Sequence, residues 1–236
     1  MNPGMRLNVL SRHLVGGAPA GASSFERVDK RLPQLFMHRR TLDELPDLNV
    51  PAGYSVRTYR EGDAGHWCAI LNDTSGMGEW VGPEAEQRLI NNGPFGDMRE
   101  LSANHGLDGK FEPSNLFFVE DPSGEPCATA CAWTKQTSHG LVGELHMVSV
   151  KPGHRGKRLG HVVTAVVLHR FKELGFTSAH LGTDDWRVAA IRSYWGCGYE
   201  AEISHWSHNA RWAALEKFRD SDLSAPNIPA PPGMIE

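Results

Sequence analysis

The spacing of apolar side chains changes period several times along the chain, and each change separates a predicted strand from a predicted helix. Strand-like segments carry apolar residues at alternate positions or in short runs, and they cover residues 35–42, 54–59, 116–120, 127–134, 141–150, 178–182 and 203–208. The segment from Leu159 to Leu174 instead repeats apolar residues every three or four positions, which predicts a helix with one buried face. Gly175 follows and predicts the end of that helix.

Capping residues predict three further helices. Asp63 precedes a helix that continues through Leu71, Pro83 opens a helix with an acidic first turn, and Asn209 precedes a short helix near the C-terminus. Residues 92–115 are rich in Gly and Pro and predict loops. The pattern as a whole predicts a protein of the α/β class, with a mixed sheet flanked by helices.

Composition narrows the class of protein. With 236 residues and 40% apolar content, the chain can bury a substantial core, and a single domain is expected. A formal net charge of −4 argues against nucleic acid as a partner, and no apolar run reaches the length of a membrane span. The four cysteines have neither disulfide nor metal-ligand spacing, which favours a reducing compartment and predicts a cytoplasmic protein that needs no metal.

The two ends of the chain differ from its middle. We expect a partly irregular N-terminal extension over residues 1–50, a central domain over 51–207, and a short helix with a Pro-rich tail over 208–236. The first two dozen residues contain no Asp or Glu, a composition shared by disordered tails and organelle transit peptides, and we expect a tail.

The loop from Lys151 to Arg158 carries the strongest chemical signal. Five of its eight residues are cationic or can become so, and glycines at positions 153, 156 and 160 allow its backbone to curl closely around a ligand. A strand that leads into such a loop, which in turn opens a helix, directs amide groups and the positive end of the helix dipole at one point. The loop therefore predicts a phosphate or pyrophosphate site; a basic surface turn is the alternative. It contains neither an ATP-type P-loop nor a dinucleotide fingerprint.

This loop resembles the acetyl-CoA-binding signature of the GNAT N-acetyltransferase superfamily, Arg/Gln-x-x-Gly-x-Gly/Ala between a strand and a helix. Residues 155–160 occupy that position, although Arg158 stands where the family pattern has its central glycine. A second landmark, residues 183–199, resembles the late helix of the superfamily with its Ala-Ile-x-x-Tyr ending. The resemblance covers roughly residues 51–207, and the predicted order β-α-α-β-β-β-α-β-α-β fits the GNAT fold.

The resemblance implies an N-acetyltransferase that transfers an acetyl group from acetyl-CoA to a primary amine. The alternative is a GNAT-like module that binds an acyl-CoA without turnover. The residues that the resemblance assigns to coenzyme binding are Val148, Val150, Arg155, Gly156, Lys157, Arg158, Leu159, Gly160 and Arg187. Arg187 stands where the family often has Asn, and it could bind coenzyme, bind acceptor or lie on the surface.

Two catalytic residues are implied. Glu144 falls where several family members have a catalytic glutamate, and strand alternation places it on one face with His146 and Val148. Glu144 is the expected general base, with acceptor binding or a solvent-facing position as alternatives, and His146 is the alternative base. Tyr194 matches the family tyrosine near the coenzyme sulfur, which can protonate the leaving thiolate; a core aromatic is the alternative.

The amine acceptor is the least determined part of the prediction. Residues 60–115 are expected to line its site, where Trp67, Trp80 and Trp133 could form apolar walls or belong to the core. Polyamine, aminoglycoside, amino acid, mycothiol-type amine and protein N-terminus all stay open. The expected partners are acetyl-CoA and a small-molecule or peptide amine, without metal, nucleic acid or membrane, and a homodimer is the candidate assembly.

Overall fold

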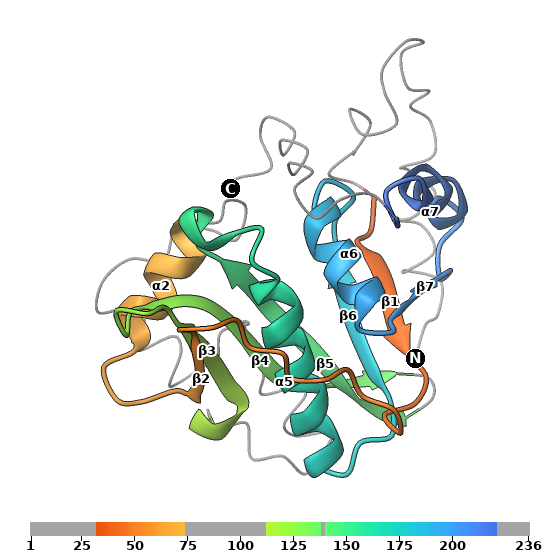
Figure 1. Ribbon diagram of the computed structural model, residues 1–236. Helices are drawn as coiled ribbons and strands as arrows, with labels where there is room; N and C mark the ends of the chain where they lie inside the picture. The colour runs from red at the N-terminus through yellow and green to blue at the C-terminus, as the bar shows by residue number, and fades with distance from the viewer. Residues whose placement is uncertain (1–31, 74–111, 138–139, 221–236) are drawn as a thin grey trace.

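The computed structural model describes residues 32–73, 112–137 and 140–220, and this part of the chain forms one seven-stranded mixed sheet (Figure 1). The strands are β1 (Leu35–Arg39), β2 (Ser55–Thr58), β3 (Leu116–Glu120), β4 (Pro126–Thr137), β5 (Gly140–Val150), β6 (Ala179–Thr183) and β7 (Glu200–Glu202), in the order β2-β3-β4-β5-β6-β1-β7. The helices are α2 (Ala64–Asp73), α5 (Leu159–Glu173), α6 (Val188–Gly196) and α7 (His208–Glu216), with 3-10 turns η2 (Pro113–Asn115) and η3 (Pro152–His154). The predicted α/β class is confirmed.

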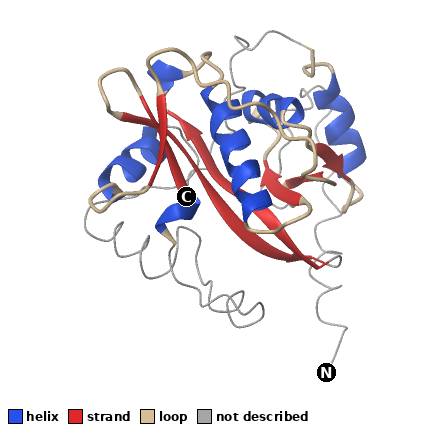
Figure 2. Cartoon of the chain, turned by 60° about the horizontal axis from the view of Figure 1, so that its bottom comes forward, coloured by secondary structure: helices blue, strands red, loops and turns tan. Residues whose placement is uncertain are grey.

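Helices cover both sides of the sheet (Figure 2). On one face α5 packs across β3, β4 and β5 and also contacts α6. On the other face α2 packs against β4 and β5. Side chains follow the period of two that a pleated strand imposes: Phe117 belongs to the core cluster of α5, whereas its neighbour Phe118 belongs to the cluster of α2. The predicted helix stop is also confirmed, because Gly175 adopts φ 85° directly after α5.

The N-terminal strand β1 is an interior strand of the sheet. It pairs antiparallel with β6 on one side and with β7 on the other, although it comes more than 130 residues before either in the chain. The boundary expected at residue 51 therefore falls between two strands of one sheet. At the other end of the chain, Trp212 and Leu215 of α7 pack into the core cluster of α5.

The predicted last strand over residues 203–208 is wrong. The strand is β7, it ends at Glu202, and Ile203 and Trp206 are exposed. His205 closes a local turn instead, since its Nδ1 atom interacts with the hydroxyl (2.9 Å) and the backbone amide (3.2 Å) of Ser207. This turn satisfies the backbone that a strand would have paired, and α7 begins at His208, two residues before the position that an Asn209 cap would give. The helix predicted at Pro83 lies outside the described residues.

Candidate active site

A bulge in β5 creates the site. Cys131 of β4 pairs with His146, but the next registered pair is Thr129 with Ser149, so β5 has one residue more than β4 over this interval. Met147 absorbs the extra residue with a left-handed backbone at φ 51°. Its amide donates to the Nδ1 atom of His146 (3.1 Å). A strand bulge at this place was part of the family resemblance, and it is confirmed.

The bulge reverses the alternation along β5, and the prediction that Val148 shares a face with Glu144 and His146 is wrong. Glu144 and His146 stand opposite Trp133 and Cys131 of β4, on the side of the sheet that α2 covers. Val148 and Val150 pack instead with the cluster of α5. The extra residue turns every later side chain of the strand to the opposite face.

Beyond the bulge, β5 and β6 separate. Their parallel pairing is limited to Gly143 with Ala179 and Glu144 with His180, while the rest of β6 pairs with β1. A cavity of about 230 Å³ occupies the resulting gap. Its walls bring together Gln34, Glu144, His146, Val148, Asp184, Arg187 and Tyr194, among others. Four residues predicted from the sequence (Glu144, Val148, Arg187 and Tyr194) thus meet in one place.

Tyr194 reaches this cavity from α6, on the face of the sheet that α5 covers. The two helices approach closely at Gly160, where a Cβ atom would lie 3.4 Å from the hydroxyl of Ser193. Burial raises the pKa of Tyr194 to about 12, although the nearby charge of Arg187 acts in the opposite direction. The phenol is therefore protonated at neutral pH. Because Glu144 lies on the α2 face, the two residues enter the cavity from opposite sides of the sheet.

His146 is less suited to act as a base than Glu144. Its Nδ1 atom accepts the amide hydrogen of Met147, so the lone pair of that nitrogen is occupied and the neutral ring carries its proton on Nε2. The ring stabilises the bulge and has no free acceptor nitrogen in this tautomer. Glu144 is a carboxylate whose oxygens are acceptors, and its role as the base stays a prediction.

A polar chain forms the wall next to Tyr194. The amide of Gln34 donates to Asp184 (3.4 Å), and the other carboxylate oxygen of Asp184 lies 3.0 Å from Nε of Arg187. Burial raises the pKa of Asp184, opposed by the charge of Arg187. Arg187 was predicted from the sequence. Gln34 and Asp184 were not, because they lie 150 positions apart and no local pattern joins them.

The basic loop leads from β5 into α5 as predicted, and its backbone has the shape of a cradle. The amides of His154 and Arg155 close the short turn η3, at 3.0 and 3.2 Å from the carbonyls of Lys151 and Pro152. Gly156 then adopts φ 76° and Arg158 adopts φ 62°. Arg158 therefore takes the left-handed conformation that glycine adopts most readily, at the position where the family pattern has glycine.

Some side chains of the loop bind backbone carbonyls in or next to the loop, and others contact the rest of the protein. Arg155 donates to the carbonyl of Val150 (3.2 Å) and Lys157 to that of Gly153 (3.0 Å), so both brace the loop. His154 turns towards Tyr54, whose hydroxyl lies 3.1 Å from its Nδ1 atom. The side chain of Leu159 is buried in the core, which leaves only its backbone to meet a ligand. Coenzyme binding by these residues stays a prediction.

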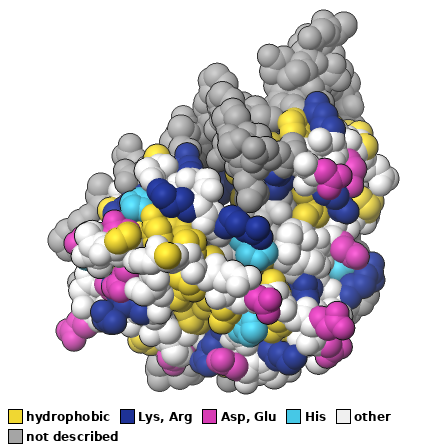
Figure 3. All heavy atoms as spheres, in the orientation of Figure 1, with side chains coloured by type: hydrophobic (Ala, Val, Ile, Leu, Met, Phe, Trp, Pro, Cys, Tyr) yellow, Lys and Arg dark blue, Asp and Glu magenta, His cyan; other side chains and the backbone are white. Residues whose placement is uncertain are grey.

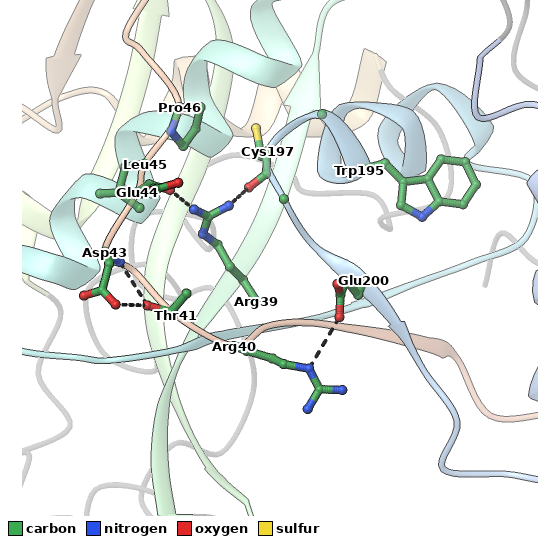
Figure 4. A pocket seen from close by; sticks show the side chains of 12 residues that line it. Arg39, Arg40, Thr41, Asp43, Glu44, Leu45, Pro46, Trp195, Cys197 and Glu200 are labelled. Carbon is green, nitrogen blue, oxygen red and sulfur yellow. Dashed lines mark hydrogen bonds and ion pairs between the residues drawn. The ribbon is translucent and has the colours of Figure 1, made fainter.

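A larger cavity of about 740 Å³ lies elsewhere, between the segment after β1 and the end of α6 (Figure 4). Arg39 points into it, but its guanidinium donates to the backbone carbonyls of Cys197 and Glu44. None of the predicted catalytic or coenzyme-binding residues lines this cavity. We assign it no part in the chemistry.

Other predicted features fall into the core or outside the described residues. Trp67 is fully buried and Trp133 packs against the same cluster around α2, whereas Trp80 is not among the described residues. Within residues 32–73, 112–137 and 140–220, no three His, Cys, Asp or Glu side chains are grouped as metal ligands would be. No helix in those ranges is long and apolar enough to cross a bilayer. On the face drawn in Figure 3, basic and acidic side chains are interspersed.

Residues 67–199, more than half of the chain, match the family described as acetyltransferase (GNAT) family. The chain belongs to the GNAT acetyltransferase family. The predicted family is thereby confirmed, and the sheet with its bulge and cradle is the GNAT fold. A crystal structure of a GCN5-related N-acetyltransferase from Sphaerobacter thermophilus has the same fold, with a TM-score of 0.50 and 18% sequence identity over 72% of this chain and 50% of that one.

Two similar curated proteins are named mycothiol acetyltransferases. A mycothiol acetyltransferase of Nocardia farcinica is 27% identical over 199 residues, which cover 78% of this chain and 58% of the relative. A mycothiol acetyltransferase of Frankia casuarinae is 29% identical over 218 residues, covering 86% and 59%. This GNAT chain therefore spans less than two thirds of the length of these relatives.

Proposed function

We propose that this GNAT protein transfers an acetyl group from acetyl-CoA to the primary amine of a small molecule. The observation that carries the proposal is the cavity between β5 and β6, which is lined by a carboxylate from one face of the sheet and a phenol from the other, while β5 continues into the basic loop that opens α5. An acyl transfer needs a base for the amine and a donor for the leaving group, and these are the two groups present.

The residues present fit acetyl-CoA as donor. The open backbone around Gly156 and Arg158 can bind the pyrophosphate, since among the described residues the amides of Gly156, Lys157 and Arg158 donate to no backbone carbonyl. The edge of β5 that faces β6 is unpaired beyond Glu144 in the described sheet. The backbone at Val148 and Val150 can therefore bind the amide groups of the pantetheine arm as an added strand would.

The reaction then proceeds by direct attack. Glu144 accepts a proton from the acceptor amine, whose nitrogen attacks the thioester carbonyl carbon to form a tetrahedral intermediate. As the intermediate collapses, the C–S bond breaks and the electron pair leaves on sulfur. The products are an N-acetyl amide and coenzyme A. An amine that arrives as ammonium loses two protons in all: Glu144 passes the first to solvent, and the second, lost as the intermediate forms and collapses, balances the proton that the thiolate finally gains.

Tyr194 acts at the sulfur. An ordinary thiol has a pKa of about 8.5, well below the value of about 12 that burial gives the phenol, so complete proton transfer from phenol to thiolate is uphill. We propose that Tyr194 donates a hydrogen bond to the sulfur as negative charge develops there, and that the thiolate takes its final proton from solvent. This role needs the protonated phenol, which is the form present up to strongly alkaline pH.

The acceptor proposal draws on the relatives. Curated proteins 27–29% identical to this chain are named mycothiol acetyltransferases, which favours a small-molecule amine over a protein N-terminus. The cavity walls contain two carboxylates, Glu144 and Asp184, which suit an amine that arrives protonated. A cytoplasmic location, a homodimer and independence from metals stay predictions.

A screen of primary amines tests the function. The purified chain is incubated with acetyl-CoA and each amine, including amino sugars and cysteinyl amino sugars, and released thiol is measured against an amine-free control. At least one small-molecule amine should release thiol in proportion to an acetylated product seen by mass spectrometry. Tight coenzyme A binding without release for any amine would replace the enzyme proposal with the acyl-CoA-binding module.

A further inference from the structure

Arg211 lies on α7, outside both the matched family region and the cavity, yet it is tied to the cavity wall on two sides. Its Nε atom lies 2.9 and 3.1 Å from the two carboxylate oxygens of Asp185, in the loop between β6 and α6. Its Nη1 atom donates to the backbone carbonyl of Pro33 (2.8 Å), just before β1. One guanidinium thus joins three segments that are distant in the sequence.

Both contacts of Arg211 are one residue away from groups that line the cavity. Pro33 precedes Gln34, and Asp185 follows Asp184, and Gln34 and Asp184 are hydrogen-bonded to each other. The side chain of Asp185 is only 5% exposed and that of Arg211 13% exposed, so solvent screens this pair weakly. Arg211 therefore holds the backbone next to Gln34 and next to Asp184, the first two residues of the polar chain in the cavity wall.

The polar chain ends at Arg187, whose Nε atom lies 3.0 Å from a carboxylate oxygen of Asp184. Arg187 lines the cavity together with Tyr194 and Glu144. A shift of the β6–α6 loop would move the carboxylate of Asp184 and the cation of Arg187 relative to the reacting groups. Displacements of about 1 Å in such groups can lower rates about 100-fold.

We propose that the Arg211–Asp185 ion pair positions the active site, because it fixes Asp184 and Arg187 beside Tyr194. In this way α7 and Gln34, which lie outside the matched family region of residues 67–199, complete a site whose catalytic groups lie inside it. Arg211 is a positioning residue, because it acts through Asp185 and touches no reacting atom. The effect on turnover rests on the proposed function, whereas the effect on the loop does not.

The first variant is Arg211→Lys, which keeps the charge but cannot form the two-pronged contact with Asp185 and the Pro33 contact together. We expect kcat to fall about tenfold and KM for the amine to rise. The Kd for coenzyme A should stay within twofold, because the hydrogen bonds described for Arg211 go to Asp185, Pro33 and Ser207 and to no residue of the loop 151–160. Arg219→Lys is the matched control. Arg219 lies just after the same helix, pairs with the exposed Glu216 (2.9 Å) and stacks its guanidinium over Trp195 of α6 (4.9 Å to the ring centroid), and lysine keeps the cation for both contacts. It should behave as wild type.

A double-mutant cycle separates positioning from general weakening of the fold. If Arg211 acts through Arg187, then Arg211→Lys should lower kcat less than twofold in an Arg187→Lys background. An equal fall in both backgrounds would overturn the proposal. Should Arg211→Lys not fold, the pair Asp185→Leu with Arg211→Met leaves no buried charge unpaired and should give a folded protein with the same loss of kcat.

Amide hydrogen exchange gives a readout that does not depend on activity. Exchange over residues 183–187 should be at least tenfold faster in Arg211→Lys than in Arg219→Lys, with α5 unchanged. Unchanged amide exchange over residues 183–187 would overturn the proposal that Arg211 holds this loop. Faster exchange with a wild-type kcat would overturn the proposal that the loop positions the active site. If no amine in the screen makes the wild-type chain release thiol, the proposed function fails, and the exchange measurement still decides whether Arg211 holds the loop.

Discussion

Two replacements of Arg158 distinguish the effect of its left-handed backbone conformation from the effect of its positive charge. Arg158 stands at the N-terminus of α5 with φ 62° and ψ 15°. A residue with a side chain loses about 1–2 kcal/mol in this left-handed conformation, whereas glycine adopts it freely but loses about 0.5–1 kcal/mol more backbone entropy on folding. The balance predicts that Arg158→Gly stabilises the protein by about 0.5–1 kcal/mol.

The same change removes a cation from the predicted phosphate site. An exposed charge pair contributes up to about 1 kcal/mol, which corresponds to about a fivefold weaker Kd for coenzyme A. Because solvent screens such pairs, the loss should shrink as salt rises. Arg158→Gly should therefore fold more stably and bind the coenzyme less tightly.

Two measurements on two variants test this reasoning. In Arg158→Gly the melting temperature should rise by about 1–4 °C for a chain of this size, and calorimetric titration should show the weaker Kd. Arg158→Ala keeps the left-handed cost and loses the cation, so its Kd should weaken equally while its melting temperature stays close to wild type. A lower melting temperature in Arg158→Gly would refute the backbone assignment. An unchanged Kd in both variants would refute the phosphate contact.

The remaining predictions concern catalysis and pH. Tyr194→Phe keeps the packing but removes the donor to sulfur, so kcat should fall about 100-fold with an unchanged Kd for coenzyme A; wild-type turnover would exclude the role. Glu144→Gln should abolish the acidic limb of the pH–rate profile, and a variant that retains both limb and rate would exclude Glu144 as base. Acetyl transfer should survive a chelator, and loss that zinc or magnesium restores would contradict metal independence. Burial raises the pKa of Asp63, but the hydrogen bonds from Arg57 and from the backbone amide of Arg60, together with the charge of Arg57, lower it by more, so the net shift is downward. Arg57 also lowers the pKa of Glu120. Both folded-state pKa values lie below the unfolded ones, so stability is present above about pH 4 and is lost as the pH falls; denaturant titrations from pH 6 to pH 3 should show less of this loss in Arg57→Met.

Local signals in the sequence were sufficient for the cradle and its helix. The run of glycines and cations, the apolar stripe after Leu159 and the stop at Gly175 each lie within a few residues, and hydrogen bonds of short range determine them. Family motifs likewise located Glu144, Arg187 and Tyr194 in the cavity wall. These features need little knowledge of the rest of the chain.

Alternation along β5 failed where the tertiary structure altered the strand. One extra residue at Met147 turned Val148 to the opposite face, and the pattern of apolar residues contains no sign of it, because each side of the bulge still alternates normally. The strand predicted over residues 203–208 was wrong for a related reason, because long-range pairing decides where a strand ends. β7 pairs with β1 over three residues only, and the chain then closes a local turn.

The sequence by itself determined the class of fold, the basic loop between β5 and α5, and four of the residues that line the cavity between β5 and β6, because short-range periodicity and motifs encode them. Only the tertiary structure decided that β1 inserts between β6 and β7, that Gln34 meets Asp184, and that Arg211 joins both segments. These contacts span about 26 to 178 positions of the chain. The strand contacts form because backbone groups buried in the sheet need hydrogen-bond partners, and the Arg211–Asp185 contact forms because both side chains are largely buried, where each charge needs a partner.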